Sequence, residues 1–415
     1  MNRLLLSFLI LNFFFHLHSQ NTIDSVFLEQ KIDSIICLGL DSLAYPGAQV
    51  LISLKGETVF HKTYGFHTFE NQQVVHKDDL YDFASITKVT TGLPILMKLY
   101  GEGRFDLDAP LKSYLPKFKG SNKGNLTFRE MLAHQAQLKP YIVFWQKALK
   151  KNGRFKRRTF NEGPSKKYSI QITNDLFLHE KYRKRMVKTI KKSSLELEKE
   201  YKYSGLLFLL LPEIIENITG EDFVAYLSKN IYETIGASTL TYNPLTKFPI
   251  DRIIPTELDT FFRKQLIHGT VHDEAAAMLG GISCNAGLFG SAKDLDKLFQ
   301  LYLNEGYWQG KSVIASKAIQ EFTKCQFCET ENRRGLGFDK PMIEYETGKG
   351  YVAKSASSQS FGHSGFTGTF VWADPKEDLI VIFLSNRVYP TRENRKLYSM
   401  NIRPMLHQVI YDSLN

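Results

Sequence analysis

Two pairs of predicted strands lie at opposite ends of this chain, and a long, mostly helical stretch separates them. Two apolar, β-branched runs within residues 50–63 flank the turn Lys55-Gly56. Two similar runs lie within residues 369–384. From about residue 85 to 325 the apolar residues mostly recur at helical spacing instead, as in 206–217 and 292–303. A further helix is expected to close the chain over 397–414. A sheet built from both chain ends around a helical middle predicts an α/β (α+β) architecture with an inserted helical region.

The first 20 residues have the pattern of a secretory signal peptide. Arg3 provides a positive start, residues 4–15 are almost entirely apolar, and the small Ser19 is a suitable cleavage position. The apolar run is too short to cross a bilayer as an ordinary transmembrane helix. We therefore expect an exported protein, periplasmic or extracellular, with one domain over residues 21–415. An uncleaved signal that tethers this domain to the membrane is the alternative.

The net charge of +10 is concentrated in one segment, a basic insertion at about residues 139–202. This segment contains 19 lysines and arginines against 6 aspartates and glutamates, a local net charge of +13. One interpretation is contact with an anionic polymer or membrane surface. The other, which we favour, is a solvated face of the insertion. Nucleic acid is a poor candidate partner, because the chain is exported and has no recognisable nucleic-acid module.

The cysteines and one histidine could suggest metal or redox chemistry. Cys325 and Cys328 have the spacing of a metal or redox pair, and export makes a disulfide chemically feasible. A zinc site would require a second pair, so we favour two ordinary cysteines. His272-Asp273 is more typical of a cap at a helix start than of a metal pair. We expect no metal and no other cofactor.

Ser85 and Lys88 are the first candidates for catalysis. In Phe83-Ala84-Ser85-Ile86-Thr87-Lys88 the serine opens a helical pattern, where the helix-end amides create a positive field. Lys88 follows three residues later and so lies on the same helix face. A serine hydroxyl is a weak nucleophile until a neighbour takes its proton, and a lysine side chain can be that neighbour. The S-x-x-K pattern by itself is common.

Two later segments offer the groups that such a serine would need. Tyr203 precedes an apolar helical pattern and could relay protons between the nucleophile and a leaving group. In His363-Ser364-Gly365-Phe366 the histidine could bind a substrate carboxylate or assist the relay. The backbone N–H of Phe366 and that of Ser85 could form an oxyanion hole. Taken alone, Tyr203 is more typical of a packed aromatic residue, and His363 is equally typical of a turn histidine.

In combination, these segments resemble the penicillin-binding-protein and serine β-lactamase superfamily. The order is S-x-x-K early, a tyrosine in the middle and a [KH]-[ST]-G strand near the C-terminus. The chain looks most similar to class C β-lactamases, D-Ala-D-Ala carboxypeptidases, D-aminopeptidases and β-lactamase-like esterases, including β-lactamase-related domains of Bacteroidetes-type bacteria. The resemblance covers about residues 22–413, with support from Pro46-Gly47-Ala48, Leu132-Ala133-His134-Gln135, Gly280-Gly281 and Ala286-Gly287-Leu288-Phe289.

The resemblance implies both a fold and a mechanism. The fold would be β-lactamase/transpeptidase-like, an antiparallel sheet flanked by helices plus a helical subdomain, with the active site between them. Ser85 would be acylated, Lys88 would assist its deprotonation, and Tyr203 would be the shared acid and base. His363 to Gly365 would replace the usual Lys-Thr-Gly. The implied substrates are cell-wall D-amino-acid peptides, with peptidoglycan as a partner, or β-lactams and small esters.

Gly205 departs from the family pattern. The motif around the tyrosine is Tyr-x-Asn or Tyr-Ser-Asp, and the side chain missing here would normally bond to the lysine and to the substrate amide. His363, moreover, is not the permanently positive lysine of the usual motif. Two hypotheses therefore stay open. The chain is either an active serine hydrolase that works through an acyl-enzyme, or a degenerate relative that binds cell-wall peptide or a partner protein without turnover.

Overall fold

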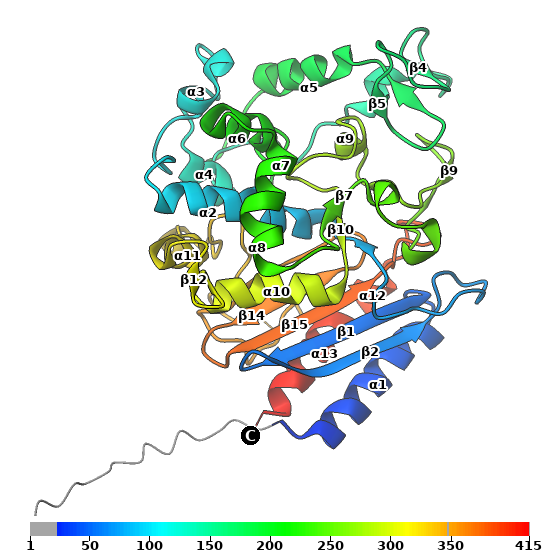
Figure 1. Cartoon of the computed structure of the whole chain (residues 1–415), viewed down its shortest axis with the longest axis vertical. Helices are drawn as coiled ribbons and strands as arrows, with labels where there is room; N and C mark the ends of the chain where they lie inside the picture. The colour runs from blue at the N-terminus through cyan, green and yellow to red at the C-terminus, as the bar shows by residue number, and fades with distance from the viewer. Residues whose placement is uncertain (1–22, 347, 415) are drawn as a thin grey trace, which may run out of the picture.

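The two ends of the chain form one five-stranded antiparallel sheet, as the strand pattern predicts (Figure 1). The computed structural model describes residues 23–346 and 348–414, so the predicted signal peptide lies outside the described residues. The sheet order is β13-β14-β15-β1-β2. Its strands are β1 (Gly47–Leu54), β2 (Glu57–Gly65), β13 (Phe361–Ser364), β14 (Phe370–Asp374) and β15 (Leu379–Ser385).

Helices cover both faces of this sheet, which explains why every residue of β1 and β15 is buried. On one face lie α1 (Ser25–Asp41) and α13 (Ile402–Asp412), which contact each other and share an apolar core with the sheet (Figure 1). On the other face lies α10 (Ala292–Leu303), with the bounds that its apolar spacing predicts. The predicted C-terminal helix is interrupted, because α12 (Lys396–Ser399) ends before Asn401 adopts a left-handed conformation.

The middle of the chain forms a helical region above α10 in Figure 1. It contains α2 (Leu93–Gly101), α4 (Phe128–Leu132), α6 (Leu211–Thr219), α7 (Phe223–Leu227) and α11 (Ser316–Thr323). The predicted start of α6 at Leu206 is five residues too early, because Pro212 stands in the first turn of the helix. Among the described residues, no helix is both long enough and apolar enough to cross a membrane.

Short strands also occur in this middle part, which the sequence predicts to be mostly helical. In particular, β10 (Leu288–Gly290) pairs on one side with β3 (Tyr81–Asp82), which directly precedes the Ser85 segment, and on the other side with β7 (Thr241–Tyr242). They bring residues about 200 positions apart in the chain side by side. Phe83, which follows β3, donates its backbone N–H to the carbonyl of Leu288 in β10.

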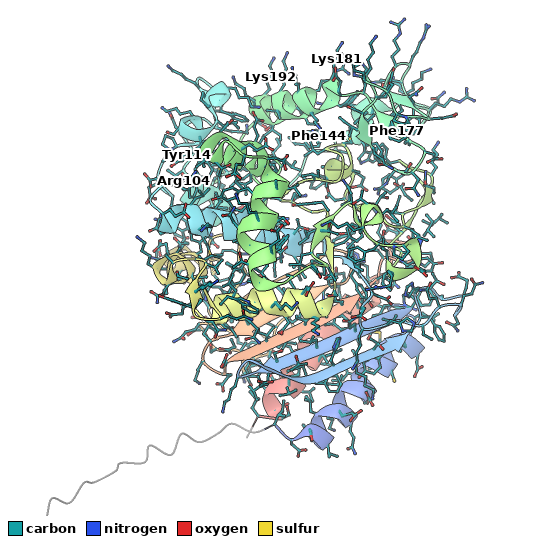
Figure 2. The ribbon with its side chains drawn as sticks, in the orientation of Figure 1. Arg104, Tyr114, Phe144, Phe177, Lys181 and Lys192 are labelled. Atoms are coloured by element: carbon teal, nitrogen blue, oxygen red, sulfur yellow. A yellow bond between two sulfur atoms is a disulfide. The ribbon has the colours of Figure 1, made fainter. Side chains whose placement is uncertain are left out.

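The basic insertion is a small mixed layer at the end of the molecule far from the five-stranded sheet (Figure 1). It contains the short strands β4 (Phe160–Asn161), β5 (Ile170–Gln171) and β6 (Phe177–Leu178), followed by α5 (Lys181–Lys192). Tyr182, Met186 and Ile190 of α5 are buried against the rest of the protein. Long side chains with nitrogen tips extend outward along this end in Figure 2.

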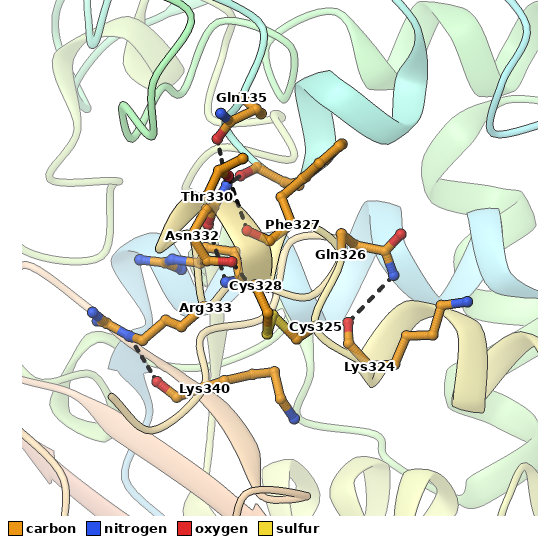
Figure 3. The surroundings of a disulfide bond; sticks show 12 residues. Gln135, Lys324, Cys325, Gln326, Phe327, Cys328, Thr330, Asn332, Arg333 and Lys340 are labelled. Atoms are coloured by element: carbon orange, nitrogen blue, oxygen red, sulfur yellow. Dashed lines mark hydrogen bonds between the residues drawn. A yellow bond between two sulfur atoms is a disulfide. The ribbon is translucent and has the colours of Figure 1, made fainter. Parts of the chain in front are cut away.

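Cys325 and Cys328 form a disulfide, so the expectation of two ordinary cysteines is wrong (Figure 3). The two cysteines are three positions apart in the chain, and their Cα atoms lie 5.9 Å from each other. Asn332 follows, and its side-chain amide donates to the carbonyl of Ala133 at 2.9 Å and to Oε1 of Gln135 at 2.7 Å. The disulfide segment is therefore bonded to the residues around His134, next to the candidate site.

Candidate active site

Ser85 lies in a tight turn rather than in the first turn of an α-helix. Residues Ala84–Ile86 form a 3₁₀ turn, and Lys88–Gly92 form a π-helical turn that leads into α2. Ala84 has a φ of 46°, a conformation that costs a non-glycine residue free energy and needs support from its surroundings. That support comes from buried Asp82, whose carboxylate accepts the N–H of Ala84 at 2.8 Å and that of His272 at 2.7 Å.

Lys88 lies directly beneath the serine, and the two face each other as their spacing predicts. Its Nζ donates to Oγ of Ser85 at 3.0 Å and to the backbone carbonyl of Asn285 at 3.0 Å. The residue is 1% exposed. Its Nζ also lies 5.2 Å from the ring centroid of Tyr203, so the lysine is close to both the candidate nucleophile and the candidate acid and base.

Tyr203 is brought to the same site by the turn that precedes α6. Its ring lies 4.5 Å from that of His134 and 6.0 Å from that of His363, centroid to centroid. The hydroxyl oxygen is buried and has no hydrogen-bond partner among the described residues. A buried hydroxyl without a partner is costly, so an unpaired one beside a candidate nucleophile indicates a functional role.

His363 is buried at the other side of Tyr203 and is held neutral. Burial lowers the pKa of His363 to about 3, and the positive charges of Arg334 and Lys88 add to this effect. Nδ1 bonds to the carbonyl of Ser364 at 2.8 Å, and because a carbonyl only accepts, Nδ1 carries the proton. Nε2 is then a free acceptor without a partner among the described residues. A neutral ring can accept a proton but supplies no positive charge for a carboxylate.

The turn that carries Gly365 and Phe366 packs directly on the Ser85 turn. Thr367 Oγ1 donates to the carbonyl of Asp82 at 2.7 Å. A Cβ atom on Gly365 would lie under 3.0 Å from the carbonyl oxygen of Phe83, so only glycine permits this approach. The backbone N–H groups of Ser85 and Phe366 have no acceptor among the described residues. Both N–H groups are therefore free to donate, and Ser85 and Phe366 line the same two cavities, as the oxyanion-hole hypothesis requires.

Arg334 is a member of this cluster that the sequence patterns did not indicate. Its guanidinium lies 5.3 Å from the Tyr203 ring centroid, on a side chain that is 7% exposed. Arg334 forms an ion pair with Asp339 at 3.3 Å. Burial alone would raise the pKa of Asp339, but the positive charges of Arg334 and Arg333 lower this pKa to about 2. Arg334 follows Tyr203 by 131 positions, so no local spacing relates the two residues.

Two cavities open at Ser85. The larger, of about 750 Å³, is lined by the serine, by Phe366 and by residues 141–146 at the start of the basic insertion. The smaller, of about 310 Å³, adds Lys88, Tyr203 and Gly205 to its lining. The insertion thus forms part of the rim of the site; Phe144, which lines both cavities, is labelled in Figure 2.

Asp273 also lines both cavities, and it caps a helix as its sequence context predicts. It precedes α9 (Glu274–Ala277), and its carboxylate accepts the N–H of Ala276 at 2.7 Å. His272 bonds to Glu257 at 2.9 Å instead of completing a metal pair with Asp273. Across the part of the chain that the structure describes, no three histidine, cysteine or acidic side chains are grouped in a way that could hold a metal ion.

The chain as a whole matches a known family. A family model described as Beta-lactamase matches residues 32–400. The chain belongs to the β-lactamase family. Its mixed architecture, with helices on both faces of an antiparallel sheet, is the β-lactamase/transpeptidase-like fold that the sequence resemblance implies. The recognition of the superfamily from its three short motifs is thereby confirmed.

Among curated relatives, a protein of Escherichia coli (strain K12) is 27% identical over 372 residues. The match covers 83% of this chain and 79% of the relative's chain. The relative's name gives it as a candidate D-alanyl-D-alanine carboxypeptidase. Among solved structures, a penicillin-binding-protein homologue from Caulobacter crescentus superposes with a TM-score of 0.65 at 18% identity, covering 93% of this chain and 98% of that one. A class C β-lactamase from Rhodobacter sphaeroides superposes with a TM-score of 0.61 at 18% identity, covering 90% of this chain and 98% of that one. At these identities the structural matches concern the fold alone.

Proposed function

We propose that this protein is a serine acyl-hydrolase that cleaves an amide or ester through an acyl-enzyme on Ser85. The observation that carries the proposal is the 3.0 Å hydrogen bond between Lys88 Nζ and Ser85 Oγ, two residues that together line a cavity of about 310 Å³. A serine needs a neighbour to take its proton, and Lys88 lies within reach. Membership of the β-lactamase family supports the same reaction class.

In the first step, Ser85 Oγ attacks the substrate carbonyl, and its proton passes to Nζ of Lys88, which acts as the uncharged amine and becomes an ammonium. The carbonyl oxygen becomes negatively charged and accepts hydrogen bonds from the free N–H groups of Ser85 and Phe366. Each of these two hydrogen bonds contributes a factor of about 10²–10³ to the rate. The carbonyl–heteroatom bond then breaks, the leaving amine or alcohol takes the proton of the Tyr203 hydroxyl, and the Lys88 ammonium returns a proton to Tyr203. The Ser85 ester that remains is the acyl-enzyme.

In the second step, a water molecule attacks the ester and passes its proton back along the same groups. The new carboxylic acid leaves and Ser85 Oγ recovers its hydrogen, so atoms and charges balance. During both steps, any negative charge on the Tyr203 oxygen develops near the cations of Lys88 and Arg334, whose centres lie 5.2 and 5.3 Å from the ring centroid. This arrangement suits a tyrosine that exchanges protons.

We propose cell-wall D-amino-acid peptides as the first substrate class to test, with β-lactams and small esters as others. The name of the Escherichia coli relative supports this choice. Such a substrate implies a protein that acts outside the cytoplasm, and the disulfide Cys325–Cys328 is consistent with an oxidising compartment. Export, periplasmic or extracellular, is therefore part of the proposal.

The test is covalent labelling of the purified protein with a fluorescent penicillin and with a fluorophosphonate. We expect both probes to label the unmodified protein and a Ser312→Ala control on an exposed strand, and neither to label Ser85→Ala. Peptide mapping should locate the adduct on Ser85. Equal labelling of the unmodified protein and Ser85→Ala would refute the assignment of the nucleophile.

The alternative is a relative that binds cell-wall peptide or a partner protein without turnover. Gly205 is the observation that favours it, because the family pattern has a polar side chain at this position. Hydrolysis of any ester or peptide by the unmodified protein, lost in Ser85→Ala, would exclude this alternative.

A further inference from the structure

The space beside Gly205 is occupied, although the residue has no side chain. A Cβ atom built on Gly205 would lie under 3.0 Å from Oδ1 of Asn285 and 3.1 Å from its Cγ. The backbone of Gly205 is not in the left-handed region, so its conformation would accept other residues. The side chain of Asn285 is therefore what requires glycine at position 205.

Asn285 is held from three directions. Its backbone N–H donates to Ser283 Oγ at 2.9 Å, and its backbone carbonyl accepts from Lys88 Nζ at 3.0 Å. Its side-chain Nδ2 donates to the carboxylate of Asp273 at 3.4 Å. These contacts fix both the main chain and the amide plane, and they connect Asn285 directly to the lysine beneath Ser85.

The amide of Asn285 keeps hydrogen-bonding capacity that the protein does not use. An asparagine side chain has two N–H donors and one carbonyl acceptor. Only one donor is engaged, so one N–H and Oδ1 have no partner among the described residues. Asn285 also lines the cavity of about 310 Å³ together with Ser85, Lys88 and Tyr203. A substrate amide offers the complementary pair, one C=O and one N–H.

We propose that Asn285 contacts substrate and supplies, from a different segment of the chain, the polar group that Gly205 lacks. Its side chain would bind an acylamino group next to the reacting carbonyl, and its main-chain carbonyl positions Lys88. The preferred substrates are then esters or amides of acylated amino acids, that is, peptide-like compounds. This inference rests on the proposed function, since it concerns the same acyl-enzyme reaction.

A pair of thioester substrates tests this directly. Hippuryl thioester carries an acylamino group, and in 4-phenylbutanoyl thioester two methylene groups replace that amide. We expect the ratio of their kcat/KM values to fall at least about tenfold in Asn285→Ala, which keeps the backbone carbonyl but loses the amide. Asn304→Ala, a control at an exposed helix end outside both cavities, should leave the ratio unchanged.

An exchange of the two residues separates substrate binding from folding defects. Gly205→Asn alone should lower activity, because its side chain would collide with Asn285. When Asn285→Gly is added, the side chain introduced by Gly205→Asn has room. The double variant should then recover at least part of the preference for hippuryl thioester that Asn285→Ala loses. Circular dichroism and melting temperature would verify that each variant is folded.

Two results would overturn the inference while the proposed function stands. In the first, Asn285→Ala has a ratio of kcat/KM values for the two thioesters within twofold of that of the unmodified protein, and Ser85 is labelled normally by the fluorophosphonate. The other is a double variant no more selective than Asn285→Ala. Absence of both labelling and thioester hydrolysis in the unmodified protein would instead refute the proposed function, and this inference with it.

Discussion

Thr369 Oγ1 donates a hydrogen bond of 3.1 Å to the backbone carbonyl of Phe83, two residues before Ser85. The turn that presents the Phe366 N–H and the turn that presents the serine are thus bonded to each other. Thr369 is fully buried, so this bond is shielded from water. The relative position of the two candidate oxyanion donors therefore depends on this hydrogen bond.

Replacing Thr369 by valine should therefore reduce both stability and rate. Valine keeps the shape but loses the donor, while the Phe83 carbonyl keeps its bond from the Ile86 N–H. We expect a loss of about 0.5–1.5 kcal/mol in the free energy of unfolding, measured in urea, and slower fluorophosphonate labelling. Thr369→Ser retains the hydroxyl and should label at close to the original rate. Equal rates for the valine and serine variants would contradict this role.

Tyr203→Phe should abolish activity without loss of stability. The Tyr203 hydroxyl is buried and unpaired among the described residues, so removing it leaves no partner unsatisfied. We expect thioester hydrolysis to fall at least about a hundredfold, the usual range for a proton-transfer group. The free energy of unfolding should stay within about 0.5 kcal/mol.

Tyr64→Phe is the matched control for this substitution. The Tyr64 hydroxyl donates to Asp33 at 2.7 Å between β2 and α1, on the far face of the sheet. Its removal should lower stability by about 1–3 kcal/mol and leave hydrolysis unchanged. A stability loss in Tyr203→Phe as large as that in Tyr64→Phe would indicate a structural rather than a catalytic tyrosine.

Mild acid should destabilise the protein through its buried histidines. Burial lowers the pKa of His407 to about 3, and burial together with two cations lowers that of His363 to about 3. Below pH 6.5 the unfolded chain takes up protons that the folded protein does not, so stability is lost as pH falls from about 6.5 towards 3. Between pH 7 and 5 this amounts to about 2 kcal/mol for each histidine.

Urea unfolding at pH 7 and pH 5 measures this effect. His407 lies away from both cavities. His407→Gln should reduce the loss of unfolding free energy between pH 7 and pH 5 by about 2 kcal/mol, the value expected for one titrating group. His76→Gln, on the exposed surface, is the control. An unchanged pH dependence in His407→Gln would show that this histidine is not held neutral by the fold.

The thiols should react in three distinct classes. Cys37 is exposed and should be alkylated in the native protein, whereas buried Cys284 should react only after unfolding. Cys325 and Cys328 should react only after reduction, because they form a disulfide. Mass spectrometry of the protein alkylated natively, unfolded, and unfolded with reductant should show one, two and four modified cysteines. Four modified thiols without reductant would rule out the disulfide.

Local signals in the sequence predicted much of the fold. Two apolar, β-branched runs around Lys55-Gly56 predicted the β1–β2 hairpin, and helical spacing predicted α10 to the residue. The start of α6 was missed, although Pro212 in its first turn is a recognised signal for a helix start. The short strands β3, β7 and β10 have only two or three residues each, too few to produce a periodic pattern.

The sequence by itself determined the candidate nucleophile, because Ser85 and Lys88 are one helical turn apart and such spacing is a local property. It also determined the family, through three motifs whose order is preserved. Only the tertiary structure decided how those motifs are completed. Arg334 reaches Tyr203 and Asn285 fills the space beside Gly205 from distant segments. Such contacts depend on how the core packs between those segments, and no spacing along the chain encodes them.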